Sequence, residues 1–324
     1  MPALVRFVAQ LPATLPAAVL VVQHFAPDSN GQHLVDRLAR HTALLCRLAA
    51  DGEPIEAGTL YLAPPDRHLL AKDGPTAHLL VTRGPRENHF RPSVDALFRS
   101  AAVAFGPRTV GIVLTGMLHD GTAGLEFIKR CGGLAIVQDP AEAEFPSMPQ
   151  SALHHVAIDY VVPLGMMGQL LDEITAPTAR RPPINIPEDL KQEAAIAERV
   201  VGLGTIEEAN QLGHLVPLTC PDCGGNLWEV KHGQVQRFRC HTGHAFTADS
   251  LLLNSQQTIE ETLWVAMRMM EERKNLLSSI ATRGESAYPA QQAERLEDIT
   301  RHINRLREFL VNGHNGSAAA NSDG

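Results

Sequence analysis

The fold class follows most directly from residues 110–138, which read VGIVLTGMLHDGTAGLEFIKRCGGLAIVQ. Apolar runs at 110–115 and 134–138 have the length and the branched aliphatic content of buried strands, and residues 122–130 between them favour a helix. A strand, a helix and a second strand within about 30 residues form a βαβ unit, whose two strands lie parallel. This segment therefore predicts an α/β protein.

The same alternation of strands and helices extends over residues 1 to about 175. Apolar runs without alternating polar positions are typical of strands in parallel sheets that helices cover on both faces. We therefore predict a doubly wound, Rossmann-like parallel sheet. Besides the strands already named, strands are expected at 19–23, 59–63 and 160–163, with crossover helices at 3–11 and 94–101.

The bulk composition excludes several function classes. The chain has 324 residues, of which 44% are hydrophobic and 20% charged, as in globular proteins. Its formal net charge of -8 leaves no large basic surface, so we expect no nucleic-acid partner. Apolar runs such as residues 17–22 are far shorter than the roughly 20 residues of a membrane span. The sequence predicts a cytoplasmic protein without membrane insertion.

The composition changes along the second half of the chain and predicts a division into domains. A stretch rich in proline, with two adjacent arginines, begins near residue 176 and is typical of a semi-extended linker. Cysteine, histidine and glycine then concentrate in a span too short to build its own core, which indicates a metal-dependent module. We predict an α/β domain at 1–175, a linker with a short helix at 176–215, a zinc-ribbon-like module at 216–250, a helical hairpin at 251–311 and a disordered tail at 312–324.

Two apolar stripes at helical spacing predict the hairpin, with residues 284–289 as its turn. The spacing also allows pairing with another chain, so a dimer through these helices is a second interpretation. The first stripe contains Ile259, Leu263, Ala266, Met270, Leu277 and Ile280, and the second contains Leu296, Ile299, Ile303, Leu306 and Leu310.

The cysteines of the second half have the spacing of a zinc site. Cys220 and Cys223 form a Cys-x-x-Cys pair followed by two glycines, and Cys240 and His244 follow after a short gap. Two short turns that each carry such a pair can place four ligands tetrahedrally around one Zn²⁺. Four protein ligands leave no open coordination position, which indicates a structural metal. His241 is the alternative fourth ligand. A redox pair is the competing interpretation, but such a pair is expected at the head of a helix.

Six motifs of the first half, taken together and in order, resemble the chemotaxis methylesterase (CheB) family. The resemblance extends from residue 1 to about 170 and suggests a stand-alone form of the family with a C-terminal zinc-ribbon-like module. The motifs lie at Val21–His24, Ala63–His68, Arg91–Phe98, Leu114–Gly121, Gln138–Pro140 and Pro146–Ala152.

This resemblance implies hydrolysis of glutamate methyl esters in the cytoplasmic domains of chemoreceptors, by a Ser-His-Asp triad without a catalytic cofactor. It implies that His24 is the general base, that Asp120 orients it and that the backbone of Met117 stabilises the oxyanion. Independently, His24 follows one predicted strand and Asp120 follows another, and the carboxyl ends of parallel strands meet at one edge of a sheet. Asp120 is also expected to cap the helix at 122–130.

The nucleophile is the main departure from the family. In the family a serine on a Gly-x-Ser-x-Gly-Gly turn precedes the histidine by about 26 residues. Counting back from His24 passes Met1, so we expect this serine on a segment upstream of the given start. Ser29, Ser93 and Ser147 do not lie on a glycine-rich turn between strand and helix, and caps or turns are their expected roles.

A second function class remains open from the residues alone. The chain could be a catalytically silent docking or scaffold module of a chemosensory signalling complex. It would then bind receptor tails through the cleft and other partners through the zinc module and the helices.

Overall fold

The computed structural model describes residues 2–26, 28–176, 182, 184–198, 206–282 and 289–312. The chain divides after Leu251 into two compact units. Residues 177–181, 183 and 199–205 of the expected linker, residues 284–288 of the expected turn and residues 313–324 of the expected tail lie outside the described residues. Among the described helices, none combines the length and the apolar character that a membrane crossing needs.

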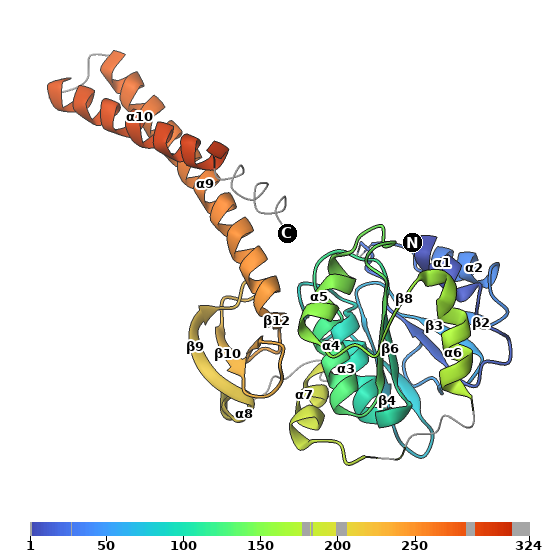
Figure 1. Ribbon diagram of the computed structural model, residues 1–324. Coiled ribbons are helices and arrows are strands. Elements are labelled where there is room, and N and C mark those ends of the chain that lie inside the picture. The colour runs from blue at the N-terminus through green and yellow to red at the C-terminus, as the bar shows by residue number, and fades with distance from the viewer. Residues whose placement is uncertain are drawn as a thin grey trace. The chain divides into compact units, whose positions relative to one another are not determined.

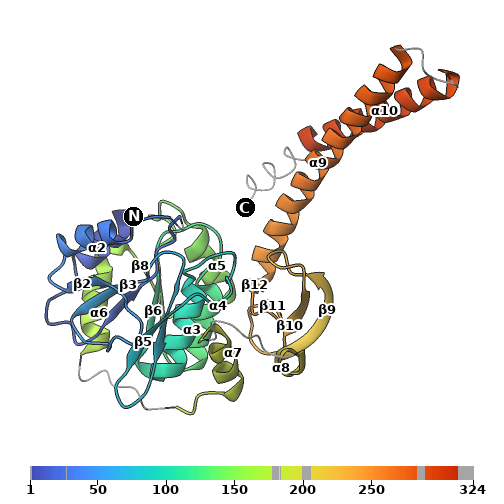
Figure 2. The ribbon, with the colours of Figure 1, turned by 180° about the vertical axis from the view of Figure 1, so that it is seen from behind.

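Parallel strands form the centre of the first unit (Figures 1 and 2). They form two three-stranded sheets, in the orders β1-β3-β2 and β6-β7-β8, where the sequence predicts one continuous sheet. Among the described residues, β1 and β6 each pair on one side only and are therefore edge strands. The strands are β1 (Val19–Val21), β2 (Leu45–Leu48), β3 (Thr59–Leu62), β6 (Val110–Val113), β7 (Leu134–Gln138) and β8 (Tyr160–Val162).

An antiparallel hairpin of β4 (His68–Lys72) and β5 (His78–Thr82) was not predicted from the sequence. β4 packs against the helix α3 (Val94–Phe105), and four of its five residues are buried. The apolar run of each strand is only three residues long, in HLLAK and HLLVT, which is shorter than the run of about 4–8 residues that indicates a buried strand.

Helices cover the parallel strands on both sides. The helices are α1 (Pro2–Val8), α2 (Gln32–Ala39), α3 (Val94–Phe105), α4 (Thr122–Arg130), α5 (Ser147–His155) and α6 (Met167–Thr175), and two short 3-10 turns lie at Gly106–Arg108 and Leu164–Met166.

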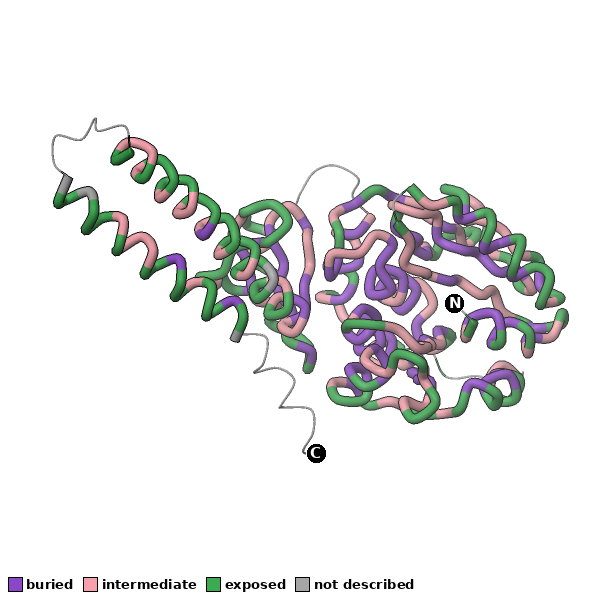
Figure 3. Tube along the Cα trace, turned by 90° about the horizontal axis from the view of Figure 1, so that it is seen from above, coloured by how far each residue is buried: buried purple, intermediate pink, exposed green. Residues whose placement is uncertain are grey.

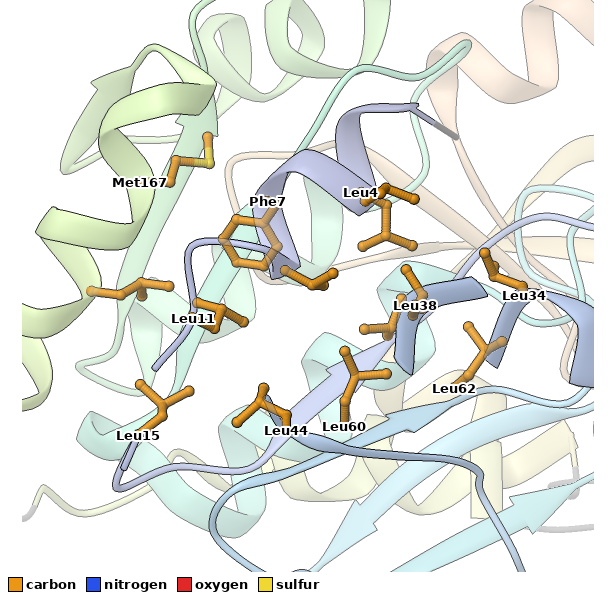
Figure 4. Close-up of a cluster of buried hydrophobic side chains, with 14 of the residues drawn as sticks. Leu4, Phe7, Leu11, Leu15, Leu34, Leu38, Leu44, Leu60, Leu62 and Met167 are labelled. Carbon is orange, nitrogen blue, oxygen red and sulfur yellow. The ribbon is translucent and has the colours of Figure 1, made fainter. Parts of the chain in front are cut away.

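The largest core cluster joins α1, α2 and α6 to the strands (Figure 4). Phe7 of α1, Leu38 of α2, Leu60 of β3 and Met167 of α6 belong to this cluster, and so does Ile136 of β7. Burial of each such side chain stabilises the fold by about 1.5–3 kcal/mol. Because this cluster contains residues from both parallel sheets, it holds them in one domain. A second cluster lies under α4 and α5 and contains Leu125, Phe127, Ala135, Val137 and Ala152.

A four-stranded antiparallel sheet with the order β12-β11-β10-β9 contains the clustered cysteines. Leu227, Phe238 and Phe246 form its small core together with Cys220 and Cys240. The sheet belongs to the first compact unit. Its elements are β9 (Gly213–Thr219), β10 (Asn226–Val230), β11 (Arg237–Cys240) and β12 (Ala245–Thr247), and the helices α7 (Glu188–Glu198) and α8 (Ile206–Leu212) precede it.

The second unit is a pair of helices, formed by most of α9 (Ala248–Thr282) and by α10 (Pro289–Asn312). Met267, Ile303 and Leu310 are buried between them, whereas most other positions are exposed (Figure 3). Ile259 lies on the predicted apolar stripe but is 54% exposed. With 35 residues against 24, α9 is the longer helix, so part of it has no partner in α10.

Candidate functional site

The structure brings His24 and Asp120 into direct contact. His24 lies three residues beyond the end of β1, and Asp120 lies in the loop that leads from β6 to α4. The distance between His24 Nε2 and Asp120 Oδ2 is 2.8 Å, although 96 residues separate them in the sequence. The Asp120 side chain is fully buried, whereas that of His24 is 23% exposed. The pair therefore has an inaccessible acid and an accessible base.

Asp120 lies against the N-terminus of α3. Its Oδ1 accepts hydrogen bonds from Ser93 Oγ at 2.8 Å and from the Asp95 N–H at 3.1 Å, and its Oδ2 accepts one from the Val94 N–H at 2.7 Å. Burial by itself raises the pKa of Asp120, but the hydrogen bonds and the charge interaction with His24, together with those helix N–H groups, hold the pKa below its ordinary value. Asp120 is therefore ionised at neutral pH.

The expectation that Asp120 caps the helix at 122–130 is wrong. Asp120 caps α3, while the N-terminus of α4 is served by Asp95. Asp95 Oδ1 accepts hydrogen bonds from the Gly121 N–H at 2.9 Å and the Gly124 N–H at 2.7 Å. Gly121, which lies between Asp120 and α4, has φ +99°, a conformation that glycine adopts without strain.

Asp95 was missed by sequence reasoning, although it lies in the motif at 91–98. It is buried, and burial together with the neighbouring Asp120 charge raises the pKa of Asp95 to about 8, while the Gly124 N–H and Arg99 act to lower it. Two buried carboxyl groups this close favour one negative charge between them. The charge resides on Asp120, which has the histidine as partner.

The His24 ring is stacked on a second residue that sequence reasoning missed. The Phe90 ring lies parallel to it, at 4° between the planes and 3.9 Å between the ring centroids. With Nε2 bonded to Asp120, Nδ1 is the ring nitrogen that has no protein partner among the described residues. No local pattern points to Phe90, because the contact joins positions 24 and 90.

Met117 lies in the loop between β6 and Asp120, and its side chain is 62% exposed. The neighbouring N–H groups are used within the protein: that of Gly116 donates to the Phe145 carbonyl at 2.9 Å, and that of Leu118 donates to Ser147 Oγ at 3.1 Å. In the part of the chain that the structure describes, the Met117 N–H has no such acceptor. Leu118 adopts φ +70°, so this non-glycine residue takes the left-handed conformation.

The three serines considered from the sequence differ in their surroundings. Ser93 is buried and donates to Asp120, and Ser147 donates to the Gly116 carbonyl at 3.0 Å. Both hydroxyls therefore hold loops in place. Ser29 Oγ is buried without a hydrogen-bond partner among the described residues, so it makes no hydrogen bond with His24.

The Cys/His cluster has the geometry of a tetrahedral metal site. Cys220, Cys223, Cys240 and His244 each offer one ligand atom, and these atoms lie within 4.8 Å of one another. The Sγ atoms of Cys223 and Cys240 are 3.8 Å apart, and His244 Nδ1 lies 3.5 Å from Cys240 Sγ and 3.7 Å from Cys220 Sγ. Bonds of about 2.3 Å to sulfur and about 2.0 Å to nitrogen require separations of about 3.8 and about 3.5 Å. The residues therefore fit zinc, and His241 is outside the set.

Two similar turns present these ligands. The Gly224 N–H donates to the Cys220 carbonyl at 2.8 Å, and the Gly243 N–H donates to the Cys240 carbonyl at 2.9 Å. Both glycines have positive φ, +73° and +98°. A hydrogen bond with Cys220 lowers the pKa of Cys240 to about 3 despite burial, and a hydrogen bond with Cys240 raises the pKa of His244 to about 9. These shifts favour the thiolate form of Cys240, which is the form in which cysteine binds a metal.

The fold and the His24–Asp120 contact define an α/β protein with a hydrogen-bonded histidine–aspartate pair at the carboxyl ends of its parallel strands. A family model described as CheB methylesterase matches residues 1–171, and the chain belongs to this family. The resemblance inferred from the motifs is thereby confirmed.

Relatives with curated names match the same half of the chain. A protein-glutamate methylesterase/protein-glutamine glutaminase 2 of Methanosarcina mazei is 39% identical over 181 residues, which cover 53% of this chain and 47% of the relative. A protein of Photorhabdus laumondii named protein-glutamate methylesterase/protein-glutamine glutaminase is 39% identical over 173 residues, covering 53% of this chain and 49% of the relative. The chain thus spans about half the length of these relatives.

A solved structure shows the same fold. The crystal structure of the CheB methylesterase catalytic domain of Thermotoga maritima has a TM-score of 0.52 and 32% sequence identity to this chain. The match covers 53% of this chain and 92% of that domain. This similarity confirms the α/β class with a parallel sheet.

Proposed function

We propose that the first unit is the hydrolytic part of a protein-glutamate methylesterase, which converts glutamate methyl esters of chemoreceptor cytoplasmic domains to glutamate and methanol. The observation that carries this proposal is the 2.8 Å contact between a partly exposed His24 and a fully buried Asp120. The names of the relatives support the substrate class.

In the proposed mechanism His24 moves the proton and Asp120 fixes the tautomer. Asp120 accepts the Nε2–H of His24, so the lone pair on Nδ1 faces outward and can take the proton of an attacking serine hydroxyl. The serine oxygen then bonds to the ester carbonyl carbon, and the Met117 N–H is placed to stabilise the oxyanion. The proton on Nδ1 passes to the departing methoxide, which gives methanol, and a water repeats the sequence on the acyl-enzyme.

The serine of this mechanism is proposed to be that of the family's Gly-x-Ser-x-Gly-Gly turn. Ser93 and Ser147 are poor substitutes because their hydroxyl groups are held by Asp120 and by the Gly116 carbonyl. The names of the relatives also include a glutaminase. The same groups would act on a glutamine amide if the proton on Nδ1 passed to the amide nitrogen, which then leaves as ammonia. Glutamine deamidation is therefore a second proposed reaction of this site.

The test compares two fusion proteins with the chain itself. One fusion carries, before Met1, an apolar strand and a Gly-x-Ser-x-Gly-Gly turn as the family resemblance implies, and the control fusion has alanine in place of that serine. We expect methanol release from a methylated receptor fragment with the first fusion only. Binding of the fragment without methanol release by either fusion would instead support the docking-module alternative.

We also propose that residues 216–250 are a zinc-ribbon-like module with Zn²⁺ held by Cys220, Cys223, Cys240 and His244. The donor separations support this ligand set. Zinc would act structurally, because four protein ligands leave no open position. The predicted domain boundaries, the stand-alone form of the protein and pairing of chains through the C-terminal helices are further proposals. Exposed apolar side chains on α9, among them Trp264, Val265 and Met269, support the pairing.

A further inference from the structure

The turn formed by residues 87–90 connects the Cys/His cluster with His24. It closes through reciprocal backbone hydrogen bonds, from the Glu87 N–H to the Phe90 carbonyl at 3.2 Å and from the Phe90 N–H to the Glu87 carbonyl at 2.9 Å. Its two central residues, Asn88 and His89, have φ +49° and +68°. Non-glycine residues rarely adopt this left-handed conformation unless surrounding contacts stabilise it.

Those contacts come from the cysteine-bearing sheet. The Asn88 N–H donates to the Ala245 carbonyl at 2.8 Å, and Asn88 Oδ1 accepts from the Thr247 N–H at 3.0 Å. His89 Nδ1 lies 3.0 Å from Asp222 Oδ1. Asp222 lies between the ligands Cys220 and Cys223, and Ala245 directly follows the ligand His244. Both metal-binding turns therefore contact the 87–90 turn within one residue of a proposed ligand.

On its other side the turn contacts His24 directly and reaches Asp120 through Asp95. The Phe90 ring is stacked on His24, and Asn88 Nδ2 donates to Asp95 Oδ2 at 2.8 Å. Asp95 in turn accepts from the N–H of Gly121, the residue after Asp120. Two routes thus lead from the sheet to the pair: one reaches His24 through Phe90, and the other reaches Asp120 through Asp95.

Buried ion pairs also link the cysteine-bearing sheet to the 87–90 turn, to α3 and to α7. Glu87 forms an ion pair with Arg99 of α3 and lies 3.5 Å from Arg239, which precedes the ligand Cys240. Glu193 of α7 pairs with Arg237 and also lies 3.5 Å from Arg239. All five side chains are at most 6% exposed. A displacement of β11 would leave these charges without compensation, so the sheet and the 87–90 turn are expected to move together.

We propose that metal binding at the Cys/His cluster sets the position of His24 through the 87–90 turn, with Phe90 as the positioning residue. A bound metal fixes the two ligand turns, which hold Asn88 and His89 in the left-handed conformation and thereby hold the Phe90 ring against His24. Loss of the metal releases the turn and removes the stacked ring. The proposal deepens the proposed function by adding a regulatory input to its site, and it rests on that function only for the role of His24.

The test uses the ring-proton NMR signals of His24 in the full chain, assigned by their loss in His24→Gln. A stacked aromatic ring shifts such protons upfield. We expect the upfield position in zinc-loaded protein and a downfield shift when a chelator removes the zinc. Phe90→Leu should give the downfield position with or without zinc, while it still binds zinc as the unmodified chain does. Protection of the β6 and β7 backbone N–H groups from hydrogen exchange reports whether the α/β core stays folded.

A second variant separates release of the turn from unfolding of the sheet. His89→Ala removes the contact with Asp222 but no proposed ligand, so zinc-loaded His89→Ala should keep its zinc and show His24 shifted toward the downfield position. His24 signals that stay at one position in loaded, stripped and His89→Ala protein would overturn the proposal. Because the readout needs no methanol release, failure of the coupling and failure of the proposed esterase activity are separate results.

Discussion

Asp120 caps α3, the helix that contains Asp95, and Asp95 caps α4, the helix that follows Asp120. Asp120, which precedes α4, accepts the first N–H groups of α3, and Asp95, in the first turn of α3, accepts the N–H groups of Gly121 and Gly124 at the start of α4. Each helix terminus obtains an acceptor that its own segment does not supply. This exchange fixes the Asp120 carboxylate relative to both helices, and therefore fixes the partner of His24.

Replacement of Asp95 should destabilise the first unit. Asp95→Ala leaves three buried donors without this acceptor, namely the N–H groups of Gly121 and Gly124 and the side-chain amide of Asn88, and we expect the free energy of unfolding to fall by about 1–3 kcal/mol for each unsatisfied group. Asp95→Asn keeps one acceptor oxygen and should lose less. Urea titration measures both values. Equal stabilities of Asp95→Ala and the unmodified chain would show that the cross-capping contributes nothing.

Replacement of Asp120 by asparagine should abolish most activity in the serine-bearing fusion. Both Asp120 oxygens accept hydrogen bonds, so the amide NH₂ must face donors whichever way it points. The His24 tautomer is then no longer fixed, and we expect kcat for methanol release to fall by roughly three to four orders of magnitude. Asp139→Asn, a change outside the His24 contacts, is the matched control. Retention of more than a tenth of the activity by Asp120→Asn would contradict the assigned role.

The buried ion pair of Glu87 should make the protein sensitive to acid. Burial raises the pKa of Glu87, but Arg99 and Arg239 lower it more, to about 2 against an ordinary 4.5. A carboxyl group with a depressed pKa in the folded state stabilises the fold above its unfolded pKa, and this stabilisation is lost as pH falls from about 4.5 toward 2. The loss amounts to about 3 kcal/mol.

Glu87→Gln tests this prediction because it removes the titrating group. The variant should be less stable at pH 7, where Arg99 loses its charged partner, but its stability should decrease less steeply between pH 4.5 and 2. The free energies of unfolding of Glu87→Gln and of the unmodified chain, measured over this pH range, test the prediction. Parallel pH dependences of the two proteins would assign the acid sensitivity to other carboxyl groups.

Zinc analysis tests the ligand set. We expect about one zinc per chain, and Cys223→Ser should lose it because a hydroxyl replaces one thiolate donor. His241→Ala and Cys46→Ser should retain zinc, since neither side chain belongs to the cluster. The metal content of the purified proteins gives the answer. Full zinc content in Cys223→Ser, or its loss in His241→Ala, would reassign the site.

The sequence alone determined several of the local elements, though not the β4–β5 hairpin, and the residue types of the candidate sites. The runs at 110–113 and 134–138 are strands as predicted, because burial on both faces demands uninterrupted apolar residues. The Cys-x-x-Cys spacing predicted the cluster of four possible metal donors, because turns of this kind are local structures. The sequence favoured His244 and left His241 as the alternative, and the structure brings the ring of His244 to the three cysteines.

Only the tertiary structure decided which distant residues meet. His24 and Asp120 are 96 positions apart, and His89 and Asp222 are 133 positions apart, so no periodicity links either pair. The sequence showed that His24 and Asp120 each follow a strand, but it could not show that Asp120 caps α3, that Phe90 is stacked on His24 or that the cysteine-bearing sheet holds the turn behind it. Such contacts depend on the packing of whole elements, which is fixed by side-chain volume and buried charge summed over the unit rather than by local sequence.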